Sequence, residues 1–141
     1  MNTKMTEPMW VVHAFVCINE RDPETKRVSC GRQCNAMGHV EALKEAVKQR
    51  GLQLDVRAQK AGCMEVCEHG PAVAVYPQGW FFRVFDLNDC AILADVLEGL
   101  SRGAIRSMVD LSESARMRLI APQSAAHVRA RIARERGAQQ G

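Results

Sequence analysis

The apolar positions in the first part of the chain follow two periods, which predict a strand and then a helix. Residues 10–17 (WVVHAFVC) are almost continuously apolar and rich in β-branched side chains, which is typical of a strand buried on both faces. The polar residues 18–33 predict a loop. Residues 35–50 repeat apolar positions at helical spacing between an N-cap residue, Asn35, and a helix-ending glycine, Gly51.

The next residues predict three strands and a second helix. Residues 52–58 alternate apolar and polar side chains, as expected of a half-exposed strand at a sheet edge. After a loop that bears cysteines, residues 72–76 (AVAVY) predict a short buried strand. A tight turn at 77–79 joins it to an antiparallel partner over 80–85 (WFFRVF). Asp86 should then cap a helix that fills the rest of the first hundred residues.

The order of these elements predicts the fold class. Because a helix connects the first two strands, they should be parallel, whereas the hairpin adds antiparallel strands to the same sheet. We therefore expect an α/β fold, a thioredoxin-like sandwich with a mixed sheet (β-α-β-loop-β-β-α), over residues 1–100. Residues 101–141 have an irregular apolar pattern and predict a C-terminal extension, with a short basic helix over 124–136.

The composition is that of a globular protein. The 141 residues are 47% hydrophobic and 25% charged, which excludes wholesale disorder. No apolar run reaches the ~18 residues of a membrane helix, and residues 1–8 lack the basic and apolar segments of a secretory signal. The sequence thus predicts a cytoplasmic protein without membrane contact. Thiols stay reduced in that compartment, so the six cysteines favour metal or redox chemistry over disulfides.

The net charge of +3 is unevenly distributed. Residues 101–141 carry eight arginines and three acidic residues, a charge of +5, which leaves −2 for the first hundred residues. We expect the extension to steer an acidic redox partner through the arginines of its short helix, Arg129, Arg131, Arg134 and Arg136. The alternative is that it packs Ile105, Met108 and Leu119 onto the domain and leaves its arginines in water. Nucleic-acid binding is disfavoured because no aromatic residues interleave the arginines.

Four cysteines form the most specific pattern in the chain. Cys17 ends the first predicted strand, Cys30 follows after twelve residues, and Cys63 and Cys67 lie in the next loop with three residues between them. Four thiolates that converge from two loops satisfy an iron–sulfur cluster or a tetrahedral zinc ion. The spacings differ from the close C-x2-C pairs of zinc knuckles and ribbons. The sequence therefore predicts a metal or cluster site.

Three features of residues 10–100 occur together: the strand that runs into Cys17, the twelve-residue gap to Cys30, and the segment GCMEVCEHGPAVAVYPQGW over 62–80. Together they resemble the thioredoxin-like 2Fe-2S ferredoxins. The resemblance implies a homodimer that shuttles single electrons between redox partner proteins, with the iron of a 2Fe-2S cluster bound by Cys17, Cys30, Cys63 and Cys67. Two features depart from the family, an extra cysteine at Cys34 and the arginine-rich extension.

The surroundings of such a cluster would have to stabilise its negative charge. Backbone N–H groups in glycine-bearing loops are the usual means. Gly62 and Gly70 bracket the second cysteine pair and should let the backbone curl around sulfur. The N-terminus of the first predicted helix, just past Cys30, should add a favourable dipole.

Two other functions remain open, a zinc-stabilised binding module and a thiol redox sensor that uses Cys30 and Cys34. We interpret Cys34 as a bystander, Cys90 as a small core residue and His69 as a solvent-exposed loop residue. No residues look like a nucleophile and its base, so no enzymatic activity is expected. The aromatic side chains of the strand predicted over 80–85 should lie either in the hydrophobic core or at a strand-mediated dimer surface; they are Trp80, Phe81 and Phe82.

Overall fold

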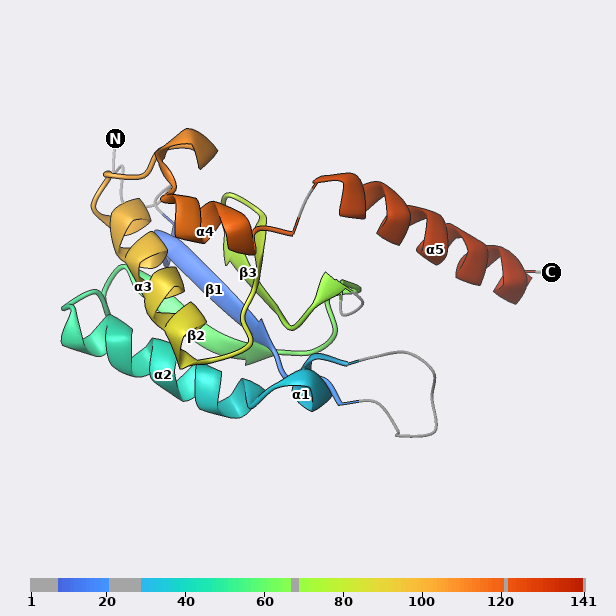
Figure 1. The fold of residues 1–141 in the computed structure, drawn as a ribbon, viewed down its shortest axis with the longest axis horizontal. Coiled ribbons are helices and arrows are strands. Elements are labelled where there is room, and N and C mark those ends of the chain that lie inside the picture. Colours follow the sequence, from blue (N-terminus) through green and yellow to red (C-terminus); the bar gives the residue numbers. More distant parts are fainter. Residues whose placement is uncertain (1–7, 21–28, 67–68, 121, 141) are drawn as a thin grey trace.

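The computed structural model describes residues 8–20, 29–66, 69–120 and 122–140, and it confirms the predicted order of strands and helices. It adds a short helix at Cys30 and gives the extension three helices (Figure 1). The elements are β1 (Val12–Cys17), α1 (Cys30–Gln33), α2 (Ala36–Gln49), β2 (Val56–Ala61), β3 (Ala72–Tyr76), β4 (Trp80–Arg83), α3 (Leu87–Ser101), a 3-10 helix (Met108–Asp110), α4 (Glu113–Arg118) and α5 (Pro122–Gln140).

The four strands form one mixed sheet in the order β2-β1-β3-β4. β1 and β2 are parallel, as the helical connection predicted, and the β3–β4 hairpin is antiparallel. Helices α2 and α3 pack against each other and on one face of the sheet (Figure 1). On β1, Ala14 is fully buried beneath these helices, whereas His13 and Phe15, on the other face, are only half-buried. The prediction that β1 is buried on both faces is therefore wrong for the second face.

The predicted edge strand over 52–58 begins later than the alternation suggested. β2 starts at Val56 and does lie at the edge of the sheet. The amide N–H of Val56 donates to the carbonyl of Leu52, 2.8 Å away, so the residues between them form a turn. This turn keeps Leu52 in the core and leaves Leu54 85% exposed. The alternation at its start therefore came from a turn rather than from a strand.

Local caps determine where α2 and α3 begin. The Asn35 side chain accepts from the amide N–H of Gly38, as predicted for an N-cap of α2. Asp86 and Asp89 form a capping box at the start of α3, in which each carboxylate accepts the other residue's backbone N–H. None of the described helices is both long and apolar enough to cross a bilayer.

The hydrophobic core includes residues from the C-terminal extension. Leu43, Leu93 and Leu97 from α2 and α3 meet the inner face of the sheet, and Leu111 and Ala115 pack into the same cluster. A Cβ at Gly99 would lie 2.5 Å from the Cδ1 atom of Ile105, so a glycine is needed for this contact. The first part of the extension therefore packs on the domain.

An ion pair also joins the extension to α3. The Nε atom of Arg118 lies 2.6 Å from Oδ1 of Asp89, and the amide N–H of Phe85 donates to Oδ2 at 2.8 Å. Burial alone would raise the pKa of Asp89. The Phe85 N–H, the Arg118 guanidinium and the Asp86 N–H outweigh it and hold this pKa below its ordinary value.

We expect Asp89→Asn to lower the free energy of unfolding by about 2 kcal/mol at neutral pH, because it leaves Arg118 and the cap without their carboxylate. Because the pKa of Asp89 is lower in the folded protein than in the unfolded chain, its carboxylate stabilises the fold at pH values above the unfolded pKa of about 3.9. This stabilisation is lost as the pH falls through the pKa of the folded protein. The unfolding free energies of the wild type and of Asp89→Asn, measured with urea, should therefore become equal in acid. Asp95→Asn, at a largely exposed ion pair with Arg50, should cost less than about 1 kcal/mol. Equal effects of the two substitutions would contradict this account of the Asp89 pair.

Candidate metal centre

Two of the four predicted ligands lie side by side in the interior. Cys17 is the last residue of β1 and Cys30 the first residue of α1, and their exposed fractions are 1% and 0%. They form a small cluster with Ala72, which begins β3. Cys63, from the loop after β2, packs against this cluster. The structure thus brings Cys17, Cys30 and Cys63 to one end of the sheet, while Cys67 lies outside the described residues.

Backbone N–H groups point at two of these sulfur atoms. The amide of Ala72 donates to Sγ of Cys30, and the amide of Glu65 donates to Sγ of Cys63, each at 3.3 Å. Such donors stabilise a thiolate and would do the same for a sulfur bound to iron. The Cys30 thiol also lies 3.8 Å from the carbonyl oxygen of Gly70. A deprotonated ligand would lose that contact but keep the Ala72 donor.

The donor set fits a cluster in its chemistry, although the described residues do not form a closed metal site. Among residues 8–20, 29–66, 69–120 and 122–140, no three Cys, His, Asp or Glu side chains stand close enough together to hold a metal ion. Cys17 and Cys30 are buried together, Cys63 packs against them, and N–H groups donate to the sulfur atoms of Cys30 and Cys63, which suits thiolates that bind iron.

The turn between the second cysteine pair depends on a residue that the sequence did not single out. Glu65 has φ of 70°, in the left-handed region that glycine favours, whereas a Cβ at Gly62 would meet nothing within 4 Å. Gly70 does have φ of 115°, and a Cβ there would lie 2.8 Å from Cγ of Arg83. The expectation for Gly70 is confirmed, and the sharp turn near Cys63 belongs to Glu65.

Burial raises the pKa of the two other cysteine thiols that the structure describes, Cys34 and Cys90. Cys34 is half-buried and its thiol donates to the carbonyl of Cys30 at 3.5 Å; burial, and then the charge of Cys17, raises its pKa. Cys90 lies in the core on α3, as predicted, and burial together with the charges of Asp89 and Asp86 raises its pKa to about 11. Neither thiol has the depressed pKa of a reactive cysteine.

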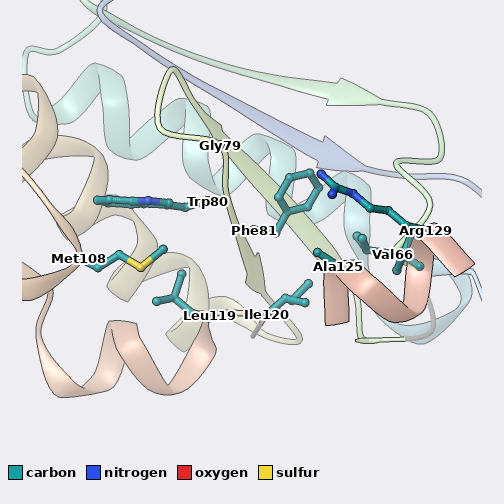
Figure 2. Close-up of a pocket in the computed structure, with 10 residues that line it drawn as sticks. Val66, Gly79, Trp80, Phe81, Met108, Leu119, Ile120, Ala125 and Arg129 are labelled. Carbon is teal, nitrogen blue, oxygen red and sulfur yellow. The ribbon is translucent and has the colours of Figure 1, made fainter. Parts of the chain in front are cut away.

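The C-terminal extension approaches the cysteines, which the sequence did not predict. Ile120 packs against the cysteine cluster, and its amide N–H donates to the carbonyl of Phe81 at 2.8 Å. His69, predicted to be exposed, is half-buried, and its ring meets His127 of α5 edge-on at 5.4 Å between centroids. A cavity of about 420 Å³ lies between β4 and α5, where Phe81 and Val66 face Ala125 and Ile120 (Figure 2).

Two curated proteins are similar to this chain in sequence. The chain is 34% identical over 73 residues to a 2Fe-2S ferredoxin of Clostridium pasteurianum, covering 71% of that protein and 51% of this chain. It is 30% identical over 73 residues to a 2Fe-2S ferredoxin of Aquifex aeolicus, covering 66% of that protein and 51% of this chain. No protein-family model matches the chain.

Solved structures resemble the fold. The thioredoxin-like [2Fe-2S] ferredoxin of Aquifex aeolicus superimposes with a TM-score of 0.61 at 23% identity, over 78% of this chain and 96% of the other. Two serine variants of that ferredoxin superimpose with TM-scores of 0.60 at 22% identity, over 78% of this chain and 98% of the other. The predicted fold class is confirmed, and the chain belongs to the family of thioredoxin-like 2Fe-2S ferredoxins.

Proposed function

We propose that this protein is a one-electron carrier that binds a 2Fe-2S cluster through Cys17, Cys30, Cys63 and Cys67. The observation that carries the proposal is the convergence of Cys17, Cys30 and Cys63 on one cluster, with N–H donors to two of the sulfurs. Two relatives named 2Fe-2S ferredoxin match this chain over 73 residues, which supports a cluster of that type. We take residues 1–100 as the ferredoxin domain and residues 101–141 as its C-terminal extension, from which Leu111 and Ala115 lie in the core of the domain.

The protein's own contribution to this chemistry is binding and electrostatic. A bound 2Fe-2S cluster supplies a site that takes up and releases one electron. The Ala72 and Glu65 amides stabilise negative charge on sulfur, and the burial of Cys17 and Cys30 keeps water from both thiolates. We expect the chain to act as an electron carrier rather than as an enzyme, because its relatives are ferredoxins and the sequence shows no nucleophile with its base.

A visible spectrum with metal and sulfide analysis tests this proposal. A purified 2Fe-2S protein should be red-brown and contain iron and acid-labile sulfide in equal amounts. A colourless protein that holds zinc would instead support the zinc-stabilised module. A colourless protein without metal, whose thiols oxidise reversibly, would support the redox sensor.

Redox partner proteins, a donor and an acceptor in the cytoplasm, are the partners that this function requires. Arg129, Arg134 and Arg136 are exposed on α5 and can attract an acidic partner surface. Arg131 differs, because its side chain is only 11% exposed. These three exposed arginines are therefore our candidate docking surface. Their positive charge is opposite in sign to the net charge of −2 on the first hundred residues.

We expect a homodimer with twice the chain mass of 15.7 kDa by sedimentation at micromolar concentration. Trp80 and Phe82 are buried within the chain, so they are not available for the strand-mediated dimer contact that the sequence suggested. An aromatic row crosses the sheet face opposite α2 and α3, where adjacent rings of His13, Phe15, Tyr76 and Phe81 lie 4.1, 6.1 and 6.4 Å apart.

Substitution within this row distinguishes it from other apolar surface. Phe15→Arg should give a monomer that keeps the wild-type visible spectrum, because a charge would be buried in the contact. Phe85→Arg, at an exposed aromatic outside the row, should remain dimeric. A monomeric wild-type protein would refute the dimer.

A further inference from the structure

Arg131 of α5 binds the loop that carries Cys63. Its Nη2 atom donates to the main-chain carbonyl oxygen of Glu65 at 2.6 Å, and its Nη1 atom lies 3.0 Å from Oε2 of the same residue. Nη1 also pairs with Glu135, one helical turn away, at 3.2 Å. The Arg131 side chain is 11% exposed, so this guanidinium is largely removed from water.

The residue that Arg131 binds is the one that positions a donor at Cys63. Glu65 has φ of 70°, and its amide N–H donates to Sγ of Cys63 at 3.3 Å. A left-handed conformation in a residue other than glycine costs about 1–3 kcal/mol and persists only where neighbouring groups hold it. The Arg131 contact to the Glu65 carbonyl is such a restraint, because it fixes the peptide next to that N–H.

Apolar and ring contacts hold α5 where Arg131 can reach this loop. Val128, one turn before Arg131, is only 7% exposed and lines the cavity shared with Phe81 and Val66. His127 meets His69 edge-on, and Figure 1 shows α5 at the end of the sheet where the cysteine loop lies. Val128 and His127 therefore keep α5 near the cysteine loop, where Arg131 contacts Glu65.

We propose that Arg131 is a positioning residue of the cluster site, which holds the Glu65 N–H on Cys63 and raises the reduction potential through its charge. The proposal rests on the proposed function and extends it to the C-terminal extension. One-electron reduction makes the site more negative, so a nearby cation stabilises the reduced form. The carboxylates of Glu65 and Glu135 are about half exposed, at 45% and 46%, so water screens their charges more than that of Arg131.

A redox titration of the cluster-loaded protein, followed by visible absorption, tests the effect of charge. At the wild-type midpoint potential, Arg131→Gln should lower the ratio of reduced to oxidised protein about tenfold, which is about 59 mV for a one-electron couple. Arg131→Lys keeps the charge and should shift the ratio by less than about threefold. Arg134→Gln, with the same charge change at an exposed position of α5, is the matched control and should stay within about twofold of wild type.

Hydrogen exchange of residues 62–66 in the protein without a cluster tests the positioning role. Both Arg131→Gln and Arg131→Lys should speed exchange of the Glu65 amide about tenfold, because neither side chain reproduces the paired contacts of the guanidinium. Arg134→Gln should leave it unchanged. This measurement needs no bound cluster, so it tests the positioning role of Arg131 even if the Arg131→Gln variant fails to assemble a cluster.

The outcomes separate this proposal from the proposed function. Exchange of Glu65 that is equal in wild type and Arg131→Gln would overturn the positioning role, and equal potentials in Arg131→Gln and Arg134→Gln would overturn the charge effect. A wild-type protein that binds no cluster would instead refute the proposed function, whatever the exchange rates show.

Discussion

Alanine at Cys17, Cys30, Cys63 or Cys67 should lower the iron bound per chain at least ~10-fold and abolish the visible spectrum. Removal of one thiolate leaves an iron with an open coordination position, and changes even to residues behind the ligands typically cost 10–100-fold in metal affinity. The cost should be greatest at Cys17 and Cys30, which are fully buried and leave water little access to replace the lost sulfur. Iron and sulfide analysis after anaerobic reconstitution measures the effect.

Two other cysteines provide the controls for this series. Cys90→Ala should retain the spectrum, because Cys90 lies in the core on α3 and takes no part in the cysteine cluster. Cys34→Ala tests whether the neighbouring thiol can serve as a replacement. If Cys30→Ala has a mild effect that the double substitution with Cys34→Ala turns into complete loss, Cys34 exchanges with Cys30 as a ligand. A normal spectrum in Cys63→Ala would refute the ligand set.

Truncation after Leu100 should destabilise the protein severely. It removes Leu111, which is 2% exposed, together with Ala115 and the partly buried Ile105. Loss of one buried leucine typically costs ~2–5 kcal/mol, and the Arg118 partner of Asp89 is lost as well. A total above ~5 kcal/mol approaches the entire stability of a typical domain and should lower Tm by at least ~20 °C.

A second truncation, after Ile120, separates packing of the core from the role of α5. Among the described side chains of α5, only Val128 is buried, so its removal should lower the unfolding free energy by less than about 2 kcal/mol. The same truncation should slow electron transfer to an acidic partner at low salt, because it removes the exposed arginines. An unchanged Tm after truncation at Leu100 would mean that the extension does not support the core.

Much of the fold was predictable because short-range rules act on it directly. Asn35 and Asp86 start α2 and α3 through caps formed within three residues of each, so the sequence contains both signals. The continuously apolar β3 and the hairpin turn after it are equally local. The convergence of Cys17, Cys30 and Cys63 was predictable from the resemblance and the element order, because the strand ends and loops that carry them meet at one end of the sheet.

Features that depend on contacts between distant residues were not predictable. The left-handed conformation of Glu65 coincides with contacts from Arg131, 66 residues later, and no local pattern distinguishes this arginine from the other seven in the extension. The burial of His69 depends in the same way on α5. The sequence placed Leu54 in a strand because residues 52–58 alternate apolar and polar side chains with the two-residue period of a strand. A hydrogen-bonded turn instead determines the exposure of Leu54.

Reductive titration of the purified protein under anaerobic conditions, followed by electron paramagnetic resonance, tests most directly whether this chain carries one electron on a two-iron cluster. The oxidised protein should be silent, and reduction should consume one electron for every two iron atoms and produce a single paramagnetic species. Cys63→Ala should show neither the uptake nor the signal. A colourless protein that contains zinc, or one that takes up no electron, would contradict the assignment.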